Sequence, residues 1–355
     1  MLASSTVPGL LASANEFAGP VLFPFAPWWP FYAAFTLFVL AVLALDLGVF
    51  HRQAHEVSHR EAVAWTVVWA ALAAAFGAGF WWWLHWKLPQ LGGDTLVAAG
   101  YASDAATVAN QLTLEYFAGY VIEQSLSVDN VFVFVVILRF FAVPAKYQHR
   151  VLFYGILGAV ACRAIFIALG ALLLQYAAVV WIFGGFLALT GVKLLLPHEE
   201  KKDLSRNPVL RAIRRVLPVT QDFHGERFLV RVQGVRHATP LLVALLVIEA
   251  TDIVFAVDSV PAIYAVTREP LVVFTSNIFA ILGLRALYFL LAGAMDKFHL
   301  LHFGLGIVLI FVGAKMLLPI WDVHVPIGVS LSVICGVIGA SMGLSLVFPK
   351  RASAA

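Results

Sequence analysis

Long apolar runs, separated by short polar segments, make up most of the chain. About 20 consecutive apolar residues are enough for an α-helix to cross the hydrocarbon core of a bilayer. We count nine such windows, so the pattern predicts an all-α polytopic membrane protein with about nine transmembrane helices. The windows are Phe31–Phe50, Ala62–Leu84, Leu114–Leu138, Val151–Leu174, Ala177–Leu196, Pro240–Val266, Leu271–Ala294, Leu300–Leu318 and Val325–Val347.

The composition agrees with a lipid environment. Hydrophobic residues form 62% of the 355 positions and charged residues 12%, whereas about a quarter of the residues of a typical soluble domain are charged. The two cysteines, Cys162 and Cys335, lie inside apolar windows, which argues against a disulfide framework or a cysteine-rich metal site. No Lys or Arg precedes the first window, so a cleaved signal peptide is not expected. We predict a single transmembrane domain covering residues 1–350.

Lys and Arg are concentrated in alternate loops. If the N-terminus lies outside, the inward loops contain most of the basic residues, including Arg52 and those between Lys201 and Arg236. The outward loops then contain Lys87 and Arg268. Positive charge favours the cytoplasmic side of a membrane, so the pattern predicts an outside N-terminus and a cytoplasmic C-terminus.

The longest inward loop joins the two halves of the chain, from residue 197 to residue 239. In it, Arg211, Arg214 and Arg215 alternate with apolar residues in an amphipathic pattern that suits a helix lying on an anionic leaflet. A solvated linker explains the same charges equally well. Acidic residues in this loop, including Glu199 and Asp222, argue against nucleic-acid binding.

The sequence contains an internal repeat. A shift of 122 residues places Arg163–Pro197 over Arg285–Pro319 without a gap. The matching positions include arginine, glycine, lysine and proline, which hydrophobicity alone would not align. A shift of 129 residues extends the match one span earlier, with Glu123 over Asp252.

Each repeat unit contains three spans, residues 114–196 in the first unit and residues 240–318 in the second. Two spans precede the units at residues 31–84, and one follows them at residues 325–347. An odd number of spans inverts the second unit relative to the first. Inverted repeats are common in secondary transporters, whose binding sites lie near the midplane between the copies.

Two of the most apolar windows contain several acidic residues. An ionisable side chain near the centre of a bilayer is costly unless it is paired, neutralised or in contact with water, so it marks a candidate site. The acids could instead pair only with Arg163 and Arg285, but two arginines cannot neutralise all of them. We therefore predict a cation site, with these arginines as structural counter-charges. The predicted ligands are Glu123, Asp129, Asn130, Asp252, Asp258 and Ser259.

Three further acids are additional candidates. Asp46 ends the first window and would serve equally well as an interfacial acid paired with Arg52. Glu115 lies near the outer end of its window, where an interfacial acid is the simpler interpretation. Glu249 lies in the same window as Asp252.

Six residues separate Glu123 from Asp129, and the same number separate Asp252 from Asp258. On an ideal helix, this spacing leaves two side chains about 120° apart around the axis. Either each helix is interrupted between its acids, as in many transporter sites, or the acids line successive parts of one path. Pro261 could contribute to a break in the second unit.

The candidate ligands indicate the kind of ion. Carboxylate, amide and hydroxyl oxygens, without a nearby His or Cys, suit hard divalent cations such as Mg²⁺, Ca²⁺ or Mn²⁺. Burial favours the neutral form of a carboxyl group, so protons are expected to compete with the metal. The cation would be a transported substrate, and no permanently bound cofactor is expected. The sequence shows neither a nucleophile beside a base nor an open His-rich site, so an enzyme is not expected.

Two segments resemble the signatures of the TerC family. They are GYVIEQSLSVDNVFVF at residues 119–134 and TDIVFAVDSVPA at residues 251–262. The segment at residues 46–62 is also similar to that family, and the resemblance extends over about Phe31–Phe348.

The resemblance implies a multi-pass protein of a bacterial inner membrane or an organelle, in a family named for tellurium resistance, some of whose members export manganese. By motif match, it assigns metal handling to the six predicted ligands. An acidic core would repel a tellurium oxyanion. We therefore expect efflux of a divalent cation, Mn²⁺ above others, with proton exchange as a hypothesis. The alternative is a membrane interaction or scaffold protein in metal or tellurite stress, motivated by the basic loop.

Overall fold

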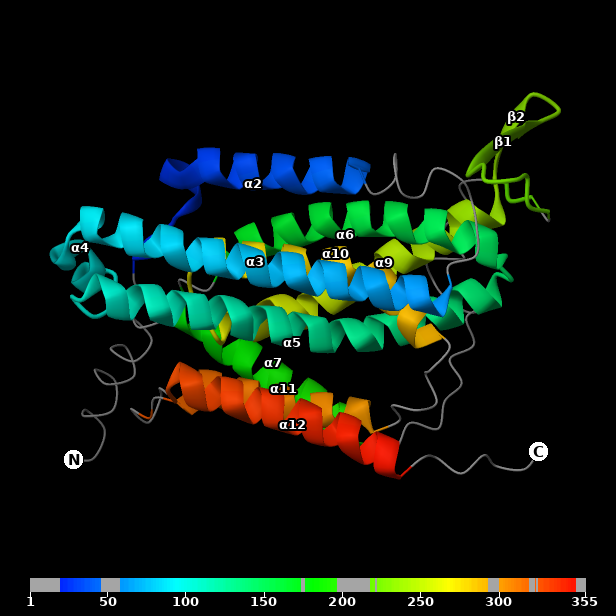
Figure 1. The fold of residues 1–355 in the computed structure, drawn as a ribbon. Coiled ribbons are helices and arrows are strands. Elements are labelled where there is room, and N and C mark those ends of the chain that lie inside the picture. Colours follow the sequence, from blue (N-terminus) through cyan, green and yellow to red (C-terminus); the bar gives the residue numbers. More distant parts are fainter. Residues whose placement is uncertain are drawn as a thin grey trace, which may run out of the picture.

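The computed structural model describes residues 20–45, 58–173, 176–196, 218–220, 222–292, 300–318, 323 and 325–348. Figure 1 shows that most of this part of the chain forms helices, which run roughly along one common direction. The helices are α2 (Phe25–Leu45), α3 (His59–Leu91), α4 (Gly93–Ala98), α5 (Ala105–Phe140), α6 (Ala145–Leu173), α7 (Ala177–Leu195), α9 (Pro240–Tyr264), α10 (Pro270–Ala292), α11 (Leu301–Leu317) and α12 (Ile327–Val347).

The predicted all-α polytopic architecture is confirmed. Among the described residues, eight helices are long and apolar enough to cross a membrane. The window Leu300–Leu318 corresponds to α11, an apolar helix of 17 residues that is shorter than a typical span. The prediction of nine full spans is therefore not confirmed in its exact number.

Several helices extend beyond the predicted windows. Helix α5 contains 36 residues, which corresponds to a length of about 54 Å and exceeds the roughly 30 Å of a hydrocarbon core. The Asp104 side chain caps its start by accepting a hydrogen bond of 2.9 Å from the Thr107 N–H. Polar residues such as Asn110 and Gln111 continue the helix outside the apolar window, which is why hydropathy alone placed its start too late.

Helix α10 lies at the centre of the bundle. Residues 270–288 are all buried, and α10 packs against α5, α3, α6 and α2. In Figure 1, it lies behind α3, while α2 lies on one side of the bundle and α7, α11 and α12 lie on the other. A polar side chain on α10 is therefore shielded from both lipid and water.

The packing of repeat-equivalent helices is symmetrical. In the repeat, α5 corresponds to α9 and α6 corresponds to α10. Helix α5 packs against α10, and the equivalent pair, α9 and α6, also packs together. Helices α7 and α11 pack against each other. A Cβ added at Gly191 would lie 2.5 Å from the Gly306 carbonyl oxygen, and one added at Gly313 would lie 2.6 Å from the Gly184 carbonyl oxygen.

These glycine contacts bear on the orientation of the units. The shift of 122 residues aligns Gly184 with Gly306 and Gly191 with Gly313, so it converts one contact into the other. The order of the contacts also makes α7 and α11 antiparallel. Antiparallel packing of equivalent helices supports the predicted inversion of the second unit, which stays a prediction for the bundle as a whole.

Of the two alternatives for the acidic helices, the structure agrees with continuous helices and not with interrupted ones. Helix α5 is continuous through Glu123 and Asp129, and α9 is continuous through Asp252 and Asp258. Neither segment contains Pro or Gly between its acids. Pro261 lies in the last turn of α9, after both acids, and the helix continues through it to Tyr264. The acids therefore occupy successive levels of uninterrupted helices.

The loop between the repeat units is only partly described. Residues 197–217, which include the predicted amphipathic segment, lie outside the described residues. The end of the loop forms a hairpin of β1 (Leu229–Val232) and β2 (Val235–Ala238), which neither sequence interpretation predicted. Its turn residues Gln233 and Gly234 have φ angles of 50° and 83°, as two-residue hairpin turns require.

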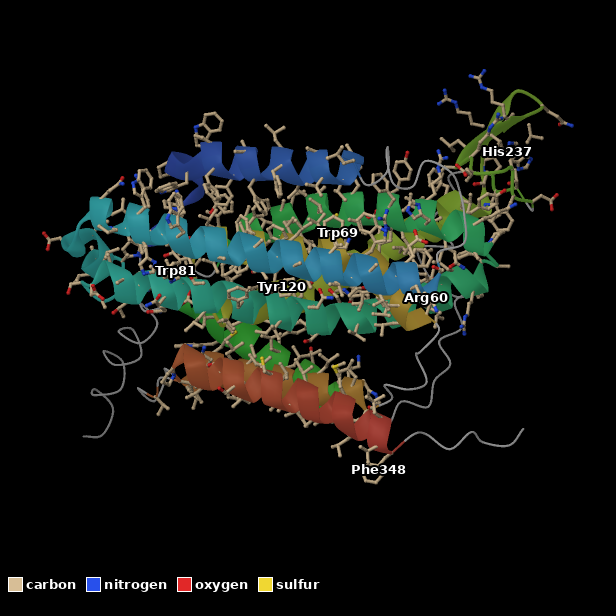
Figure 2. The ribbon with its side chains drawn as sticks, viewed as in Figure 1. Arg60, Trp69, Trp81, Tyr120, His237 and Phe348 are labelled. Carbon is tan, nitrogen blue, oxygen red and sulfur yellow. The ribbon has the colours of Figure 1, made fainter. Side chains whose placement is uncertain are left out.

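The hairpin is fixed at its base to the start of α6. Arg150 forms an ion pair of 2.5 Å with Glu226, and the Phe228 ring lies 5.2 Å from the Tyr154 ring. Figure 2 shows Arg60 and His237 towards one end of the bundle and Trp81 towards the other. The described parts of the predicted inward loops, at Arg60, Arg150 and the hairpin, thus share one end, while the assignment of that end to the cytoplasm stays a prediction.

Candidate cation-binding site

Arg163 of α6 lies at the centre of the candidate site. It is fully buried and contacts side chains from three other helices. Its Nη1 atom donates hydrogen bonds to Glu123 of α5, to Ser259 Oγ of α9 at 3.1 Å and to Asn277 Oδ1 of α10 at 3.4 Å. Its Nη2 atom lies 3.5 Å from Asp252 Oδ1 of α9. The two repeat units therefore meet at one guanidinium.

Asn277 completes the environment of Glu123. Its Nδ2 atom donates a hydrogen bond of 3.1 Å to Glu123 Oε2, while Arg163 occupies the other oxygen of the same carboxylate. Sequence reasoning missed Asn277. The available signal was an amide inside an apolar window, eight residues before Arg285, in a helix that is buried from residue 270 to residue 288.

Asp252 is held much less completely. Among the described residues, neither of its carboxylate oxygens has a hydrogen-bond partner, and the same is true of Gln124 Oε1 and Ser127 Oγ. Buried oxygens without a donor are costly and uncommon in folded proteins. Oxygen atoms of these types bind hard cations or protons, so Asp252 is the group with the most unused binding capacity.

The charges around Arg163 do not balance. The described contacts bring together two carboxylates, from Glu123 and Asp252, and one guanidinium. An uncompensated negative charge inside a membrane protein is unfavourable unless a cation or proton neutralises it. This arrangement therefore favours the binding of positive charge.

The structure brings together some of the predicted ligands. Glu123, Asp252 and Ser259 converge on Arg163, and Asn130 is buried further along α5. Arg285, the second predicted counter-charge, is buried on α10. The side chains of Asp129 and Asp258 and the whole of Asp46 lie outside the described part of the structure.

The complete set of metal ligands stays a prediction. Within the described side chains, no group of three or more His, Cys, Asp or Glu residues is placed so that it could hold a metal ion. The central cluster instead combines two carboxylates with hydroxyl and amide oxygens.

Glu249 lies beside this cluster rather than in contact with Arg163. Its carboxylate packs against Gly158 of α6, at the place where any larger residue would put its Cβ. Glu249 is partly exposed. It therefore lies in the contact between α6 and α9.

Glu115 is buried, although the sequence places it near the end of its apolar window. Helix α5 begins well before it, and the segment between α9 and α10 covers it. Its carboxylate accepts hydrogen bonds from Gln111 Nε2 at 2.9 Å and from Thr267 Oγ1 at 2.5 Å. With both oxygens engaged, Glu115 has little capacity left for a cation.

Glu269, which precedes α10, is a buried acid that the sequence analysis did not single out. Its carboxylate accepts hydrogen bonds from the N–H groups of Leu22 at 2.9 Å and Phe23 at 3.1 Å, and from the Tyr101 hydroxyl at 3.1 Å. Burial raises the pKa of Glu269 above its ordinary value, although these donors oppose the shift. The acid ties the segment before α2 to the centre of the bundle.

The family signature covers the central site. The model of the integral membrane protein TerC family matches the chain over residues 108–353. The chain belongs to the TerC family. The matched region of this TerC-family protein contains Glu123, Arg163, Asp252, Ser259 and Asn277.

Similar proteins occur in bacteria and in a plastid. The chain is 49% identical over 323 residues to an uncharacterised membrane protein of Myxococcus xanthus, with 90% of this chain and 93% of that protein covered. It is 43% identical over 309 residues to a protein of Escherichia coli K12 named as a membrane-bound redox modulator, Alx, with 86% and 91% covered. It is 45% identical over 233 residues to the chloroplastic thylakoid membrane protein TERC of Arabidopsis thaliana, with 65% and 61% covered. No solved structure matches the chain.

Proposed function

We propose that this TerC-family protein exports a divalent cation, Mn²⁺ above others, from the cytoplasm in exchange for protons. The proposal rests mainly on the environment of Asp252. This buried carboxylate has no hydrogen-bond partner among the described residues, and its Oδ1 atom lies 3.5 Å from Nη2 of Arg163, which already pairs with Glu123. Two acids share one counter-charge there. The excess negative charge lies between the two repeat units, where transporters of this plan bind their substrates.

The chemistry of the surrounding atoms favours a hard cation. Glu123, Asp252, Ser259 and Asn277 supply carboxylate, hydroxyl and amide oxygens. Mn²⁺ accepts such ligands, whereas Mg²⁺ dehydrates reluctantly and usually retains several waters. A proton can neutralise Asp252 as a metal does. Metal and proton would therefore occupy the same acid in turn, as exchange requires.

The direct test is efflux of Mn²⁺ from energised cells that express the wild type or the variants Asp252→Asn and Asp258→Asn at equal membrane abundance. We expect loss of efflux in both variants, and efflux in the wild type that changes with external pH. If both variants export Mn²⁺ as fast as the wild type does, these acids do not have the proposed roles.

A second candidate function is that of a membrane scaffold whose inward loop recruits partners. The hairpin favours this candidate, because Arg150, Glu226 and Phe228 fix it to the bundle while Arg231 and Arg236 remain exposed. Deleting most of residues 201–236, which include Arg231 and Arg236, should then abolish the cellular phenotype and leave ion flux intact. A transporter would instead lose its phenotype only when flux is lost.

The name of the Alx relatives raises redox activity as another candidate. In this chain, Cys162 of α6 and Cys335 of α12 are both free. Thiol–disulfide exchange within one chain needs a pair of cysteines close enough to bond. The described cysteines do not provide that pair, so they offer no support for this chemistry.

A further inference from the structure

Four oxygen atoms from three helices converge on the Arg163 guanidinium. They comprise two carboxylate oxygens, one hydroxyl oxygen and one amide oxygen, which are the donors that a hard divalent cation uses. A cation held by these atoms would occupy the position of the guanidinium itself. The atoms are Glu123 Oε1, Asp252 Oδ1, Ser259 Oγ and Asn277 Oδ1.

Arg163 and a divalent cation would therefore exclude each other. Their positive charges repel, and the repulsion is strong because Arg163, Glu123 and Asp252 are almost completely removed from solvent. Both also need the same lone pairs. If Arg163 kept its contacts permanently, the Glu123 oxygen that it occupies could not bind a metal ion. If Arg163 withdraws, all four oxygen atoms become available as metal ligands.

The contacts of Arg163 are suited to withdrawal. All of its hydrogen bonds to the site come from Nη1, and Nε has no hydrogen-bond partner among the described residues. Nη2 lies 3.5 Å from Asp252, whose oxygens have no hydrogen-bond partner in that part of the chain. A guanidinium in a strong structural pair usually grips a carboxylate with two parallel hydrogen bonds. Here, the planar fork is only partly used.

We propose that Arg163 is a tethered competitor of the transported cation. Its guanidinium compensates one of the two negative charges of Glu123 and Asp252 when no divalent cation is bound, and it leaves them when one binds. Its return helps to expel the cation. This inference rests on the proposed function and replaces the role of a purely structural counter-charge. In this way the buried acids face a positive charge in both states of the transport cycle.

The test measures binding of Mn²⁺ to the purified full-length protein in lipid nanodiscs, from the paramagnetic resonance signal of the free ion. The variants are Arg163→Met, which removes the competing charge, and Arg163→Lys, which keeps it. Lys193→Met is the matched control, because Lys193 is an exposed cation at the end of α7. We expect Arg163→Met to bind Mn²⁺ at least about tenfold more tightly than the wild type. Arg163→Lys and Lys193→Met should stay within a few-fold of it.

If Arg163→Met does not fold, the same question can be answered by comparing Glu123→Gln with the double variant Arg163→Met/Glu123→Gln. Glu123→Gln alone leaves Arg163 facing Asp252, so this variant should bind Mn²⁺ weakly. The double variant Arg163→Met/Glu123→Gln removes one charge of each sign and therefore preserves the balance. We expect it to bind more tightly than Glu123→Gln.

The outcomes separate the inference from the function. If the wild type binds Mn²⁺ through Asp252 but neither Arg163→Met nor the double variant binds more tightly than its parent, Arg163 builds the site and the inference is overturned. If the wild type does not bind Mn²⁺, or if Asp252→Asn binds it equally well, the proposed function is wrong and the inference is wrong with it. Tighter binding in both comparisons, with slower Mn²⁺ release in Arg163→Met, supports the tethered competitor.

Discussion

Asn277 Nδ2 donates a hydrogen bond of 3.1 Å to Glu123 Oε2, across the contact between α10 and α5. The other end of the same amide accepts from Arg163 at 3.4 Å. A single neutral side chain therefore orients both members of the central ion pair. It does so from the second repeat unit, whereas Glu123 and Arg163 both belong to the first.

Asn277→Leu should weaken Mn²⁺ binding by about tenfold, because it removes a hydrogen bond to a carboxylate that is worth roughly 1.5–3 kcal/mol. Leucine has a similar volume, so the bundle should remain folded. Asn110→Leu is the control, since Asn110 is exposed and contacts Trp81 at the surface. Equal Mn²⁺ affinity in wild type and Asn277→Leu, measured by titration in nanodiscs, would exclude this role of the amide.

The glycine contacts between α7 and α11 predict where bulk cannot be added. Gly191→Leu should destabilise the fold by more than about 2 kcal/mol, because the side chain would meet the backbone of α11 at Gly306. Gly185 has no atom within 4 Å of an added Cβ, so Gly185→Leu should be nearly neutral. The check is the thermal midpoint of each variant in detergent. Similar midpoints for the two variants would contradict the close packing.

Glu269 should make stability fall as pH rises. Burial raises its pKa in the folded protein above the ordinary 4.5, so the folded state keeps a proton that the unfolded state has released. Its favourable contribution is thus complete below pH 4.5 and is lost as pH rises towards the folded pKa. Glu269→Gln should flatten this dependence, measured as the thermal midpoint against pH.

The control for this pH dependence is Asp104→Asn. The Thr107 hydrogen bonds lower the pKa of Asp104 from 3.8, so it titrates below the relevant range, and asparagine caps a helix equally well. The pH dependence of Asp104→Asn should match that of the wild type. If Glu269→Gln also retains the full wild-type slope, other groups cause it.

Much of the fold could be predicted because lipid imposes a simple rule on each span. Backbone groups must be satisfied within a helix, so apolar length alone located most of the helices. The shared Arg, Gly and Lys positions likewise identified the repeat before any contact was known. The sequence also selected Glu123, Asp252 and Arg163, because charge in an apolar window is costly wherever it lies.

The remaining features depend on contacts between distant segments. Nothing local shows that Arg163 reaches Asp252 of the other unit, or that Asn277 faces Glu123. Glu115 looked interfacial because hydropathy does not show which loop covers a helix end. The continuity of α5 and α9 was open for a similar reason, since a spacing of six residues is equally compatible with a break and with an extended path.

Whether the acids around Arg163 bind the transported cation can be measured as Mn²⁺ flux in proteoliposomes containing wild type, Glu123→Gln, Asp252→Asn or the surface control Asp104→Asn. We expect an imposed pH gradient to drive flux in the wild type and Asp104→Asn, and we expect this flux to be lost in Glu123→Gln and Asp252→Asn. Flux that is unchanged by Asp252→Asn, or absent from correctly folded wild type, would contradict this role of the acids.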